Sequence, residues 1–197
     1  MDRKVLAVIL AAGASKRFGG TKQLAMFNGQ ILIEHVQTVL LSSTVDEVAA
    51  VLGCEIEKIA PHILAGVTLL SNDEWEEGIA SSVRRAARFA VEVRATHLFL
   101  FVCDQPFVSS CLVDKVLALS KFNPDSIIAC RYGESNGVPA LFPGAAYGDL
   151  LSLSGDCGAK SIIEKSEKLE IVDFPEGASD VDYLADLSEA NLKSEIF

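Results

Sequence analysis

Two cations and one aspartate are the residues whose types and spacing could do chemistry. Arg17 and Lys22 lie in a glycine-rich segment, Leu10–Gln23, that follows an apolar run near the N-terminus. Small residues let a backbone approach a ligand closely, and successive main-chain N–H groups in such a turn form an anion-binding concavity. Asp104 follows the most apolar run, Leu98–Cys103, where a carboxylate could hold a Mg²⁺ ion that bridges phosphate oxygens. The pattern predicts a site for a magnesium polyphosphate.

The charge of the chain is distributed unevenly. The 197 residues include 27 acids and 17 cations, a formal charge of −10, yet residues 1–23 hold five cations and one acid. A basic island in an acidic chain attracts a polyanion at one place, whereas nucleic acids and anionic membranes need a broadly basic surface. The longest apolar run, Val5–Ala12, is far shorter than the ~20 residues that span a bilayer. We expect neither a nucleic-acid nor a membrane partner.

The N-terminal segment differs from two common phosphate-binding loops. It lacks the Gly-x-Gly-x-x-Gly spacing of dinucleotide-binding loops, and Thr21 precedes Lys22, whereas a Walker loop has Ser or Thr after its lysine. A glycine-rich turn with solvated cations is the alternative for this segment, and a helix cap before Ser109 is the alternative for Asp104. The absence of a Walker pattern disfavours a kinase or NTPase.

Apolar runs alternate with amphipathic ones along the chain. Strands are expected at Lys4–Leu10, Glu47–Leu52, Thr68–Ser71, His97–Val102, Ser126–Cys130, Val138–Phe142 and Leu169–Phe174. Helices are expected at Leu32–Leu41, Glu55–Leu64, Gly78–Arg94, Ser109–Lys121, Gly158–Lys165 and Tyr183–Leu192. This alternation predicts an α/β fold, a single domain with a mostly parallel sheet covered on both faces. The short connections before Val138 and Leu169 allow an antiparallel or edge strand there.

Several motifs carry a resemblance to a known family. Leu10–Leu24 reads Leu-Ala-Ala-Gly-x-Ser-x-Arg-x-Gly-x-x-Lys-Gln-Leu once its variable positions are left open. This motif resembles that of the MobA-like nucleotidyltransferases, and most closely their molybdenum cofactor cytidylyltransferase branch. The likeness continues through the motifs at Asn72–Ser82, Cys103–Pro106, Gly137–Phe142 and Gly155–Ala159. It covers nearly the whole chain, so residues 1–197 are expected to form one such domain, with a Rossmann-like fold.

The resemblance implies an activity and a set of site residues. The implied reaction moves CMP from CTP to the terminal phosphate of a molybdopterin-type acceptor, with Mg²⁺ as cofactor and release of pyrophosphate. The implied catalytic residues are Lys22, Arg17 and Asp104. The implied nucleotide-binding residues are Leu10, Ala11, Ala12, Gly13, Arg17, Lys22, Asn72, Gly78 and Ser82. The implied metal ligands are Asp104 and Asp182.

The motif that would supply the second metal ligand departs from the family pattern. The family has Asp-x-Asp-Thr-Pro near the C-terminus, whereas Tyr183-Leu184 follows Asp182 here, so Asp180 and Asp156 remain alternatives to Asp182. Asp182 also stands where an N-cap belongs for the next helix. The loop Gly155–Lys160 is assigned to the acceptor.

Other functions remain open. GTP is the alternative donor, and a CDP-sugar or CDP-alcohol synthase would share the loop. A non-catalytic nucleotide-binding protein that hands cofactor to a molybdoenzyme or its chaperone is an alternative of another class. The five cysteines are odd in number and contain no Cys-x-x-Cys pair, which is typical of reduced thiols in the cytoplasm.

Overall fold

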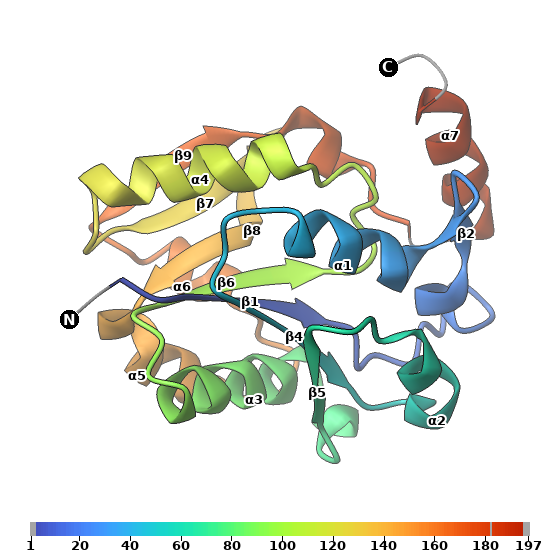
Figure 1. Cartoon of the computed structure of the whole chain (residues 1–197), viewed down its shortest axis with the longest axis horizontal. Coiled ribbons are helices and arrows are strands. Elements are labelled where there is room, and N and C mark those ends of the chain that lie inside the picture. The colour runs from blue at the N-terminus through green and yellow to red at the C-terminus, as the bar shows by residue number, and fades with distance from the viewer. Residues whose placement is uncertain (1–2, 182, 195–197) are drawn as a thin grey trace.

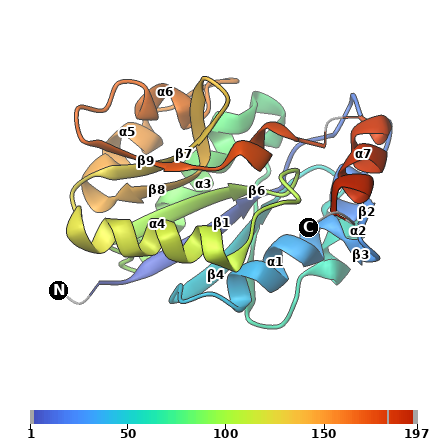
Figure 2. The ribbon, with the colours of Figure 1, turned by 90° about the horizontal axis from the view of Figure 1, so that it is seen from above.

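The computed structural model describes residues 3–181 and 183–194. Within them, one seven-stranded sheet has the order β5-β4-β1-β6-β8-β7-β9, with helices on both faces (Figures 1 and 2). Four neighbouring strands run parallel: β5 (Val67–Ser71), β4 (Glu47–Leu52), β1 (Val5–Leu10) and β6 (His97–Val102). The predicted α/β class with a mostly parallel sheet is therefore confirmed.

The other three strands extend the sheet beyond β6. β8 (Ser135–Pro143) runs antiparallel to both β6 and β7 (Ile127–Tyr132), and β9 (Leu169–Asp173) runs parallel to β7 at the edge. The strand expected at Val138–Phe142 is thus the antiparallel one. The strand expected from Leu169 is the edge strand.

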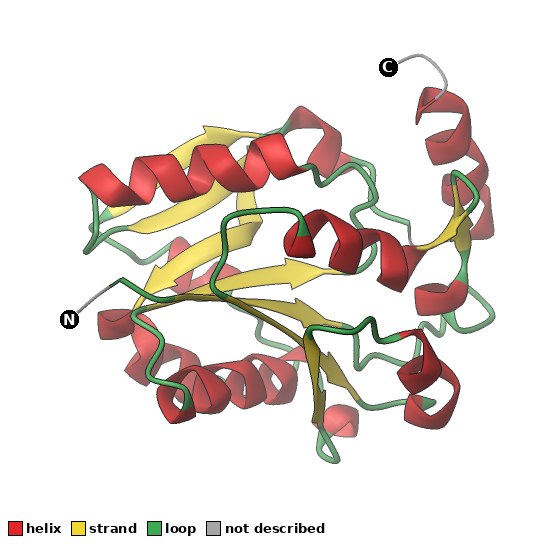
Figure 3. Ribbon diagram, in the orientation of Figure 1, coloured by secondary structure: helices red, strands yellow, loops and turns green. Residues whose placement is uncertain are grey.

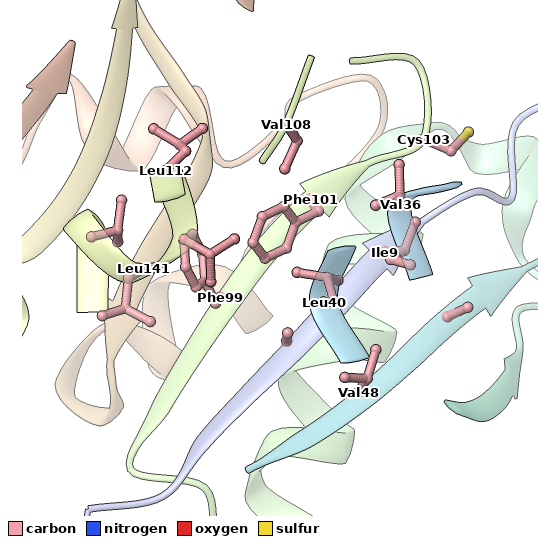
Figure 4. Close-up of a cluster of buried hydrophobic side chains, with 14 of the residues drawn as sticks. Ile9, Val36, Leu40, Val48, Phe99, Phe101, Cys103, Val108, Leu112 and Leu141 are labelled. Carbon is pink, nitrogen blue, oxygen red and sulfur yellow. The ribbon is translucent and has the colours of Figure 1, made fainter. Parts of the chain in front are cut away.

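Burial on both faces explains the continuous apolar strands. All six residues of β1 are buried. On one face the sheet packs against α1 (Leu32–Leu41) and α4 (Ser110–Phe122), where Phe99 and Phe101 of β6 meet both helices (Figure 4). The opposite face packs against α3 (Ile79–Glu92), α5 (Tyr147–Leu151) and α6 (Lys160–Ile163). Two apolar layers therefore hold the strand ends rigidly in place.

A small hairpin and the last helix form a separate cluster. β2 (Met26–Phe27) and β3 (Gln30–Ile31) are joined by Asn28 and Gly29, both with positive φ, as a tight hairpin turn requires. α7 (Leu184–Ser194) packs against this hairpin, and the Asn28 amide donates to Asn191 Oδ1 at 2.8 Å. The hairpin was not predicted, although Asn-Gly is its sequence signal.

Two expected helices are shorter than the sequence suggested (Figure 3). The helix expected at Glu55–Leu64 is α2 (Ile56–Ile59) followed by a 3₁₀ turn, because Pro61 cannot continue an α-helical hydrogen-bond ladder. The helix expected at Gly158–Lys165 is the single turn α6. Among the described residues, every helix is too short or too polar to cross a bilayer.

Candidate functional site

A pocket of about 800 Å³ opens at the carboxyl ends of β1 and β6. Open α/β sheets bind their ligands at this edge. Its walls include nine of the predicted site residues: Leu10, Ala11, Ala12, Gly13, Arg17, Lys22, Gly78, Ser82 and Asp104. The structure therefore brings residues far apart in the sequence to one cavity.

Lys22 and Asp104 form an ion pair in the lining of this pocket. Lys22 Nζ lies 2.7 Å from Asp104 Oδ2, and their side chains are 11% and 23% exposed. The reason is topological, because β1 and β6 are adjacent parallel strands whose following segments leave the sheet at the same edge. Such a partly buried cation and carboxylate can bind a phosphate and a divalent cation side by side.

Gln23 shapes the loop between β1 and Lys22. Its side chain is 3% exposed, and Nε2 donates to the carbonyl oxygens of Ala11 at 3.0 Å and Gly13 at 2.9 Å. Ser15 Oγ donates to Gln23 Oε1 at 3.3 Å. Because both carbonyls accept hydrogen bonds from Gln23, the loop is held in one conformation beside the pocket. Sequence reasoning missed this role, although Gln23 follows Lys22 in the quoted motif.

Replacing Gln23 with alanine is expected to raise the KM for nucleoside triphosphate about tenfold, because a loosened loop misplaces the groups that contact it. Steady-state kinetics with thermal unfolding provides the measurement. Gln37→Ala is the matched control, since Gln37 Nε2 also bridges two carbonyls, those of Ile33 and His62, away from the pocket. Equal effects of both variants on KM would contradict a specific role of Gln23.

Arg17 and Asn72 occupy different depths of the site. Arg17 is exposed and lines the mouth of the pocket. Asn72 is 4% exposed and lies behind the pocket wall, where Nδ2 donates to the hydroxyls of Ser81 at 2.9 Å and Ser82 at 3.1 Å. Asn72 thus orients Ser82, which does line the pocket.

Gly78 lets a distant loop close one side of the pocket. Its φ of 121° is unfavourable for other residues, and a Cβ there would lie 2.6 Å from the Gly155 carbonyl oxygen and overlap the Asp156 carboxylate. The Gly155 carbonyl in turn accepts a hydrogen bond from the Ala80 amide at 3.1 Å. Glycine at position 78 therefore places Asp156 in the pocket wall.

An ion pair fastens the same loop to α3. Arg84 donates to both carboxylate oxygens of Glu77, at 2.7 and 2.5 Å, and to the Leu153 carbonyl at 2.8 Å. Glu77 also accepts the Gly155 amide at 3.0 Å. Hydrogen bonds from Arg84, and then from the Gly155 amide, lower the pKa of Glu77 to about 2. The loop is therefore clamped over a wide pH range.

The second predicted metal ligand, Asp182, lies outside the described residues. Its neighbour Val181 is buried and donates its amide to the Asp104 carbonyl at 2.9 Å, which brings this segment against Asp104. Burial raises the pKa of Tyr132, and the charges of Asp180 and Asp104 raise it to a smaller extent. Across the described part of the chain, no three His, Cys, Asp or Glu side chains form a metal cluster. Mg²⁺ needs only one or two carboxylates beside phosphate oxygens, so these donors fit it.

Two further groups beside Asp104 are structural. Burial raises the pKa of the Cys103 thiol to about 12, which keeps it protonated and unreactive. His35 of α1 donates from Nε2 to the Pro106 carbonyl at 2.8 Å, and burial lowers the pKa of its ring. A neutral His35 thus anchors the loop that carries Asp104.

The fold is that of a nucleotidyltransferase. Residues 7–170 match the MobA-like NTP transferase domain, and the chain belongs to that family. The family expected from the motifs is confirmed.

Two curated relatives carry different names. A protein named nicotine blue oxidoreductase from Paenarthrobacter nicotinovorans is 28% identical over 86% of this chain and 86% of its own length. A probable molybdenum cofactor guanylyltransferase from Geobacillus sp. (strain WCH70) is 25% identical over 71% of this chain and 70% of its own. Sequence identities of 28% and 25% support a transferase fold but do not identify the substrates.

Among solved structures, Rv0371c from Mycobacterium tuberculosis H37Rv superimposes with a TM-score of 0.80 at 25% identity, over 98% of this chain and 99% of that one. Rv0371c has also been solved in complex with manganese, a structure that matches at a TM-score of 0.80 and 23% identity, over 98% of this chain and all of that one. The fold is thus shared along almost the whole of both chains.

Proposed function

We propose that this protein transfers CMP from CTP to the terminal phosphate of a molybdopterin-type acceptor and releases pyrophosphate. The observation that carries this proposal is the 2.7 Å contact between Lys22 and Asp104 inside a pocket large enough for a nucleotide. Family membership supports the reaction class, and the likeness to a guanylyltransferase supports the acceptor.

The chemistry requires positioning and charge neutralisation more than proton transfer. The attacking phosphate is already an anion at neutral pH, so a dedicated base is unnecessary. Lys22 and Arg17 bind the triphosphate, and the backbone from Leu10 to Gly13 contacts the nucleotide. Gly78 and Ser82 complete its binding wall, with Asn72 behind them.

Asp104 and a second carboxylate, for which Asp182, Asp180 and Asp156 are the candidates, would hold the divalent cation. When bound, Mg²⁺ neutralises charge on the phosphates. The manganese complex of Rv0371c supports a divalent metal in this fold. Lys22, which contacts Asp104 in this structure, would be available to bind a phosphate beside that metal.

The acceptor is assigned to the side of the pocket near α6. Lys160 is exposed at the start of α6 and donates to Ser135 Oγ at 3.2 Å, and the loop before it supplies Asp156 to the pocket wall. Lysine keeps the positive charge where the family often has arginine, without its planar two-pronged contact. An anionic acceptor is therefore favoured.

CTP is proposed over GTP from the Ala11-Ala12-Gly13 sequence. Both alanines are buried, so their methyl groups fill space beside the backbone that a glycine would leave open. The guanylyltransferase relative makes GTP the alternative. A CDP-sugar or CDP-alcohol synthase would share the loop and differ in its acceptor. A non-catalytic protein that carries the cofactor to a molybdoenzyme or its chaperone would share the loop and show no turnover.

Pyrophosphate release from CTP or GTP, with Mg²⁺ and phosphorylated molybdopterin, tests the function. We expect acceptor-dependent release that is faster with CTP than with GTP. Faster release with GTP would reverse the donor assignment, and release only with sugar phosphates or phosphorylated alcohols would reverse the acceptor assignment. Nucleotide binding without turnover on any acceptor would indicate the carrier, and orthophosphate as product would indicate an NTPase.

The name of the P. nicotinovorans relative makes a redox activity the second candidate. Such an activity would reduce or oxidise a dye without consuming nucleoside triphosphate. Absence of pyrophosphate release, together with dye turnover by the purified protein when a two-electron donor or acceptor is added, would favour it.

The proposed location is the cytoplasm. All five cysteines are unpaired thiols, two of them, Cys103 and Cys130, in the core. Unpaired thiols are typical of proteins in reducing compartments.

A further inference from the structure

Trp75, the only tryptophan of the sequence, begins the 3₁₀ turn that precedes α3 and lines the pocket. Its side chain is half-buried and packs against the apolar layer on the α3 face of the sheet. The part of the side chain that this layer leaves uncovered therefore borders the cavity. Neither phosphate binding nor metal binding requires an aromatic residue there.

Gly53, directly after β4, lets the tryptophan come close to the phosphate loop. A Cβ on Gly53 would lie 2.6 Å from Trp75 Cβ, 2.8 Å from Trp75 Cγ and 3.0 Å from Ala12 Cβ. Contacts that short force neighbouring atoms apart. The next amide, that of Cys54, donates to the Ala12 carbonyl at 3.0 Å and joins this segment to the loop. Trp75 is therefore packed into a fixed place beside Ala12.

Hydrogen bonds hold the turn that carries Trp75. Asn72 Oδ1 accepts the Glu74 amide at 3.2 Å, and the Asn72 amide donates to the Leu52 carbonyl at 2.8 Å. The Trp75 carbonyl accepts the Gly78 amide at 3.2 Å. A side chain that is fixed before a ligand arrives loses little entropy when the ligand binds. The turn therefore presents a preorganised surface to the pocket.

The charges of the pocket separate into two ends. Among the described residues, the cations that line it all come from the loop after β1: Lys16, Arg17 and Lys22. The wall from residues 75–82 contains no Lys or Arg and adds the carboxylate of Glu76, and Asp156 lies against Gly78 in the same wall. Phosphates are attracted to the first end and repelled from the second, whereas an uncharged base is not repelled. The base of a nucleotide whose phosphates bind these cations is therefore expected at the Trp75 end.

The order of the strands agrees with this division. Asp104 follows β6, on one side of β1 in the sheet. Gly53 follows β4 and the turn at Trp75 follows β5, and both strands lie on the other side of β1 (Figure 1). The pocket thus extends from the candidate metal site, past the phosphate loop, to the tryptophan.

We infer that Trp75 is the residue on which the base of the nucleoside triphosphate packs, with its indole ring against the face of the base. The inference rests on the proposed function, which places the phosphates at Lys22 and the metal at Asp104. Aromatic side chains stack on every base, because every base has a π-face. Trp75 therefore contributes affinity for the nucleoside, whereas Ala11 and Ala12 select between CTP and GTP.

The fluorescence of the single tryptophan provides the first test. CTP with Mg²⁺ is expected to quench the emission of Trp75, and inorganic tripolyphosphate with Mg²⁺ is expected to leave it unchanged, because only the nucleotide carries a base. Excitation at the red edge of the indole absorption avoids absorption by the nucleotide. Equal quenching by both ligands would overturn the inference, as would unchanged emission at CTP concentrations where calorimetry shows binding.

Two variants separate stacking from packing. Trp75→Leu keeps an apolar side chain without a π-face and is expected to weaken CTP binding about tenfold, an effect typical of one base stacked on one aromatic side chain. Trp75→Phe keeps a ring and should recover most of that affinity. Binding of tripolyphosphate should stay within about twofold in both variants, because the phosphates bind at the other end of the pocket. Calorimetry measures both ligands.

Phe89→Leu is the matched control. Phe89 of α3 is also a half-buried aromatic residue packed against the same apolar layer, and it lies outside the pocket lining. This variant should lose thermal stability without changing CTP affinity. The inference is wrong if Trp75→Leu and Phe89→Leu weaken CTP binding equally, or if Trp75→Leu weakens CTP and tripolyphosphate binding equally.

The binding assays also separate this inference from the proposed reaction. Wild-type protein that binds CTP with quenching but releases no pyrophosphate contradicts the proposed function and supports the role of Trp75. Wild-type protein that binds neither CTP nor GTP overturns both.

Discussion

Lys22→Ala is expected to lower turnover by at least about 10²-fold, the usual cost of losing one charged donor at a developing negative charge. Lys22 is the buried cation of the pocket, and its ammonium group lies 2.7 Å from Asp104. In the proposed function, a group in that position would contact the triphosphate next to the metal that Asp104 would hold. Pyrophosphate release under saturating CTP, with KM determined separately, provides the measurement.

A suitable control for Lys22→Ala is a variant that removes an ion pair located outside the pocket. Lys4→Ala meets this need, since Lys4 Nζ lies 2.7 Å from Glu47 Oε1 and donates to the Val93 carbonyl at 2.9 Å. It precedes β1, whereas Lys22 follows the opposite end of that strand. Turnover of Lys22→Ala close to that of Lys4→Ala would remove Lys22 from the mechanism.

The carboxyl-edge site could be predicted because its signals are local. A glycine-rich segment after β1 and an aspartate after β6 each follow an apolar strand, and parallel strands end at one edge. Neither segment alone predicts that β1 and β6 are neighbouring strands. The 2.7 Å contact of Lys22 with Asp104 therefore agrees with the expected arrangement, while their roles stay predictions.

The supporting contacts could not be predicted because each joins segments far apart in the chain. Gly78 looks like an ordinary helix start until the Gly155 carbonyl is found beside it. Tyr132 lies two residues beyond the strand expected at Ser126–Cys130, and the room for its ring depends on Gly137 of β8 and on Gly177 of the 3₁₀ turn at Pro175–Ala178. Local patterns reveal which residues can react, whereas tertiary packing determines how they are held.

Asp104→Asn is expected to lower turnover about 10³-fold, because a divalent cation supplies several kcal/mol of charge stabilisation and an amide is a poor ligand for it. The substitution keeps the shape of the side chain, which is 23% exposed beside Lys22. Unlike Lys22→Ala, this substitution leaves the Lys22 ammonium group in the pocket.

The two substitutions should therefore differ in what they do to nucleotide binding. With Asp104 neutral, Lys22 no longer has a carboxylate competing with phosphate, so metal-free CTP should bind at least as tightly as to the wild type. With Lys22 absent, the Asp104 charge repels phosphate and binding should weaken. Calorimetry with CTP in EDTA measures both, and weaker binding in Asp104→Asn would contradict this division of roles. The double variant should lose less turnover than the product of the single losses, because residues that act as one unit are not additive.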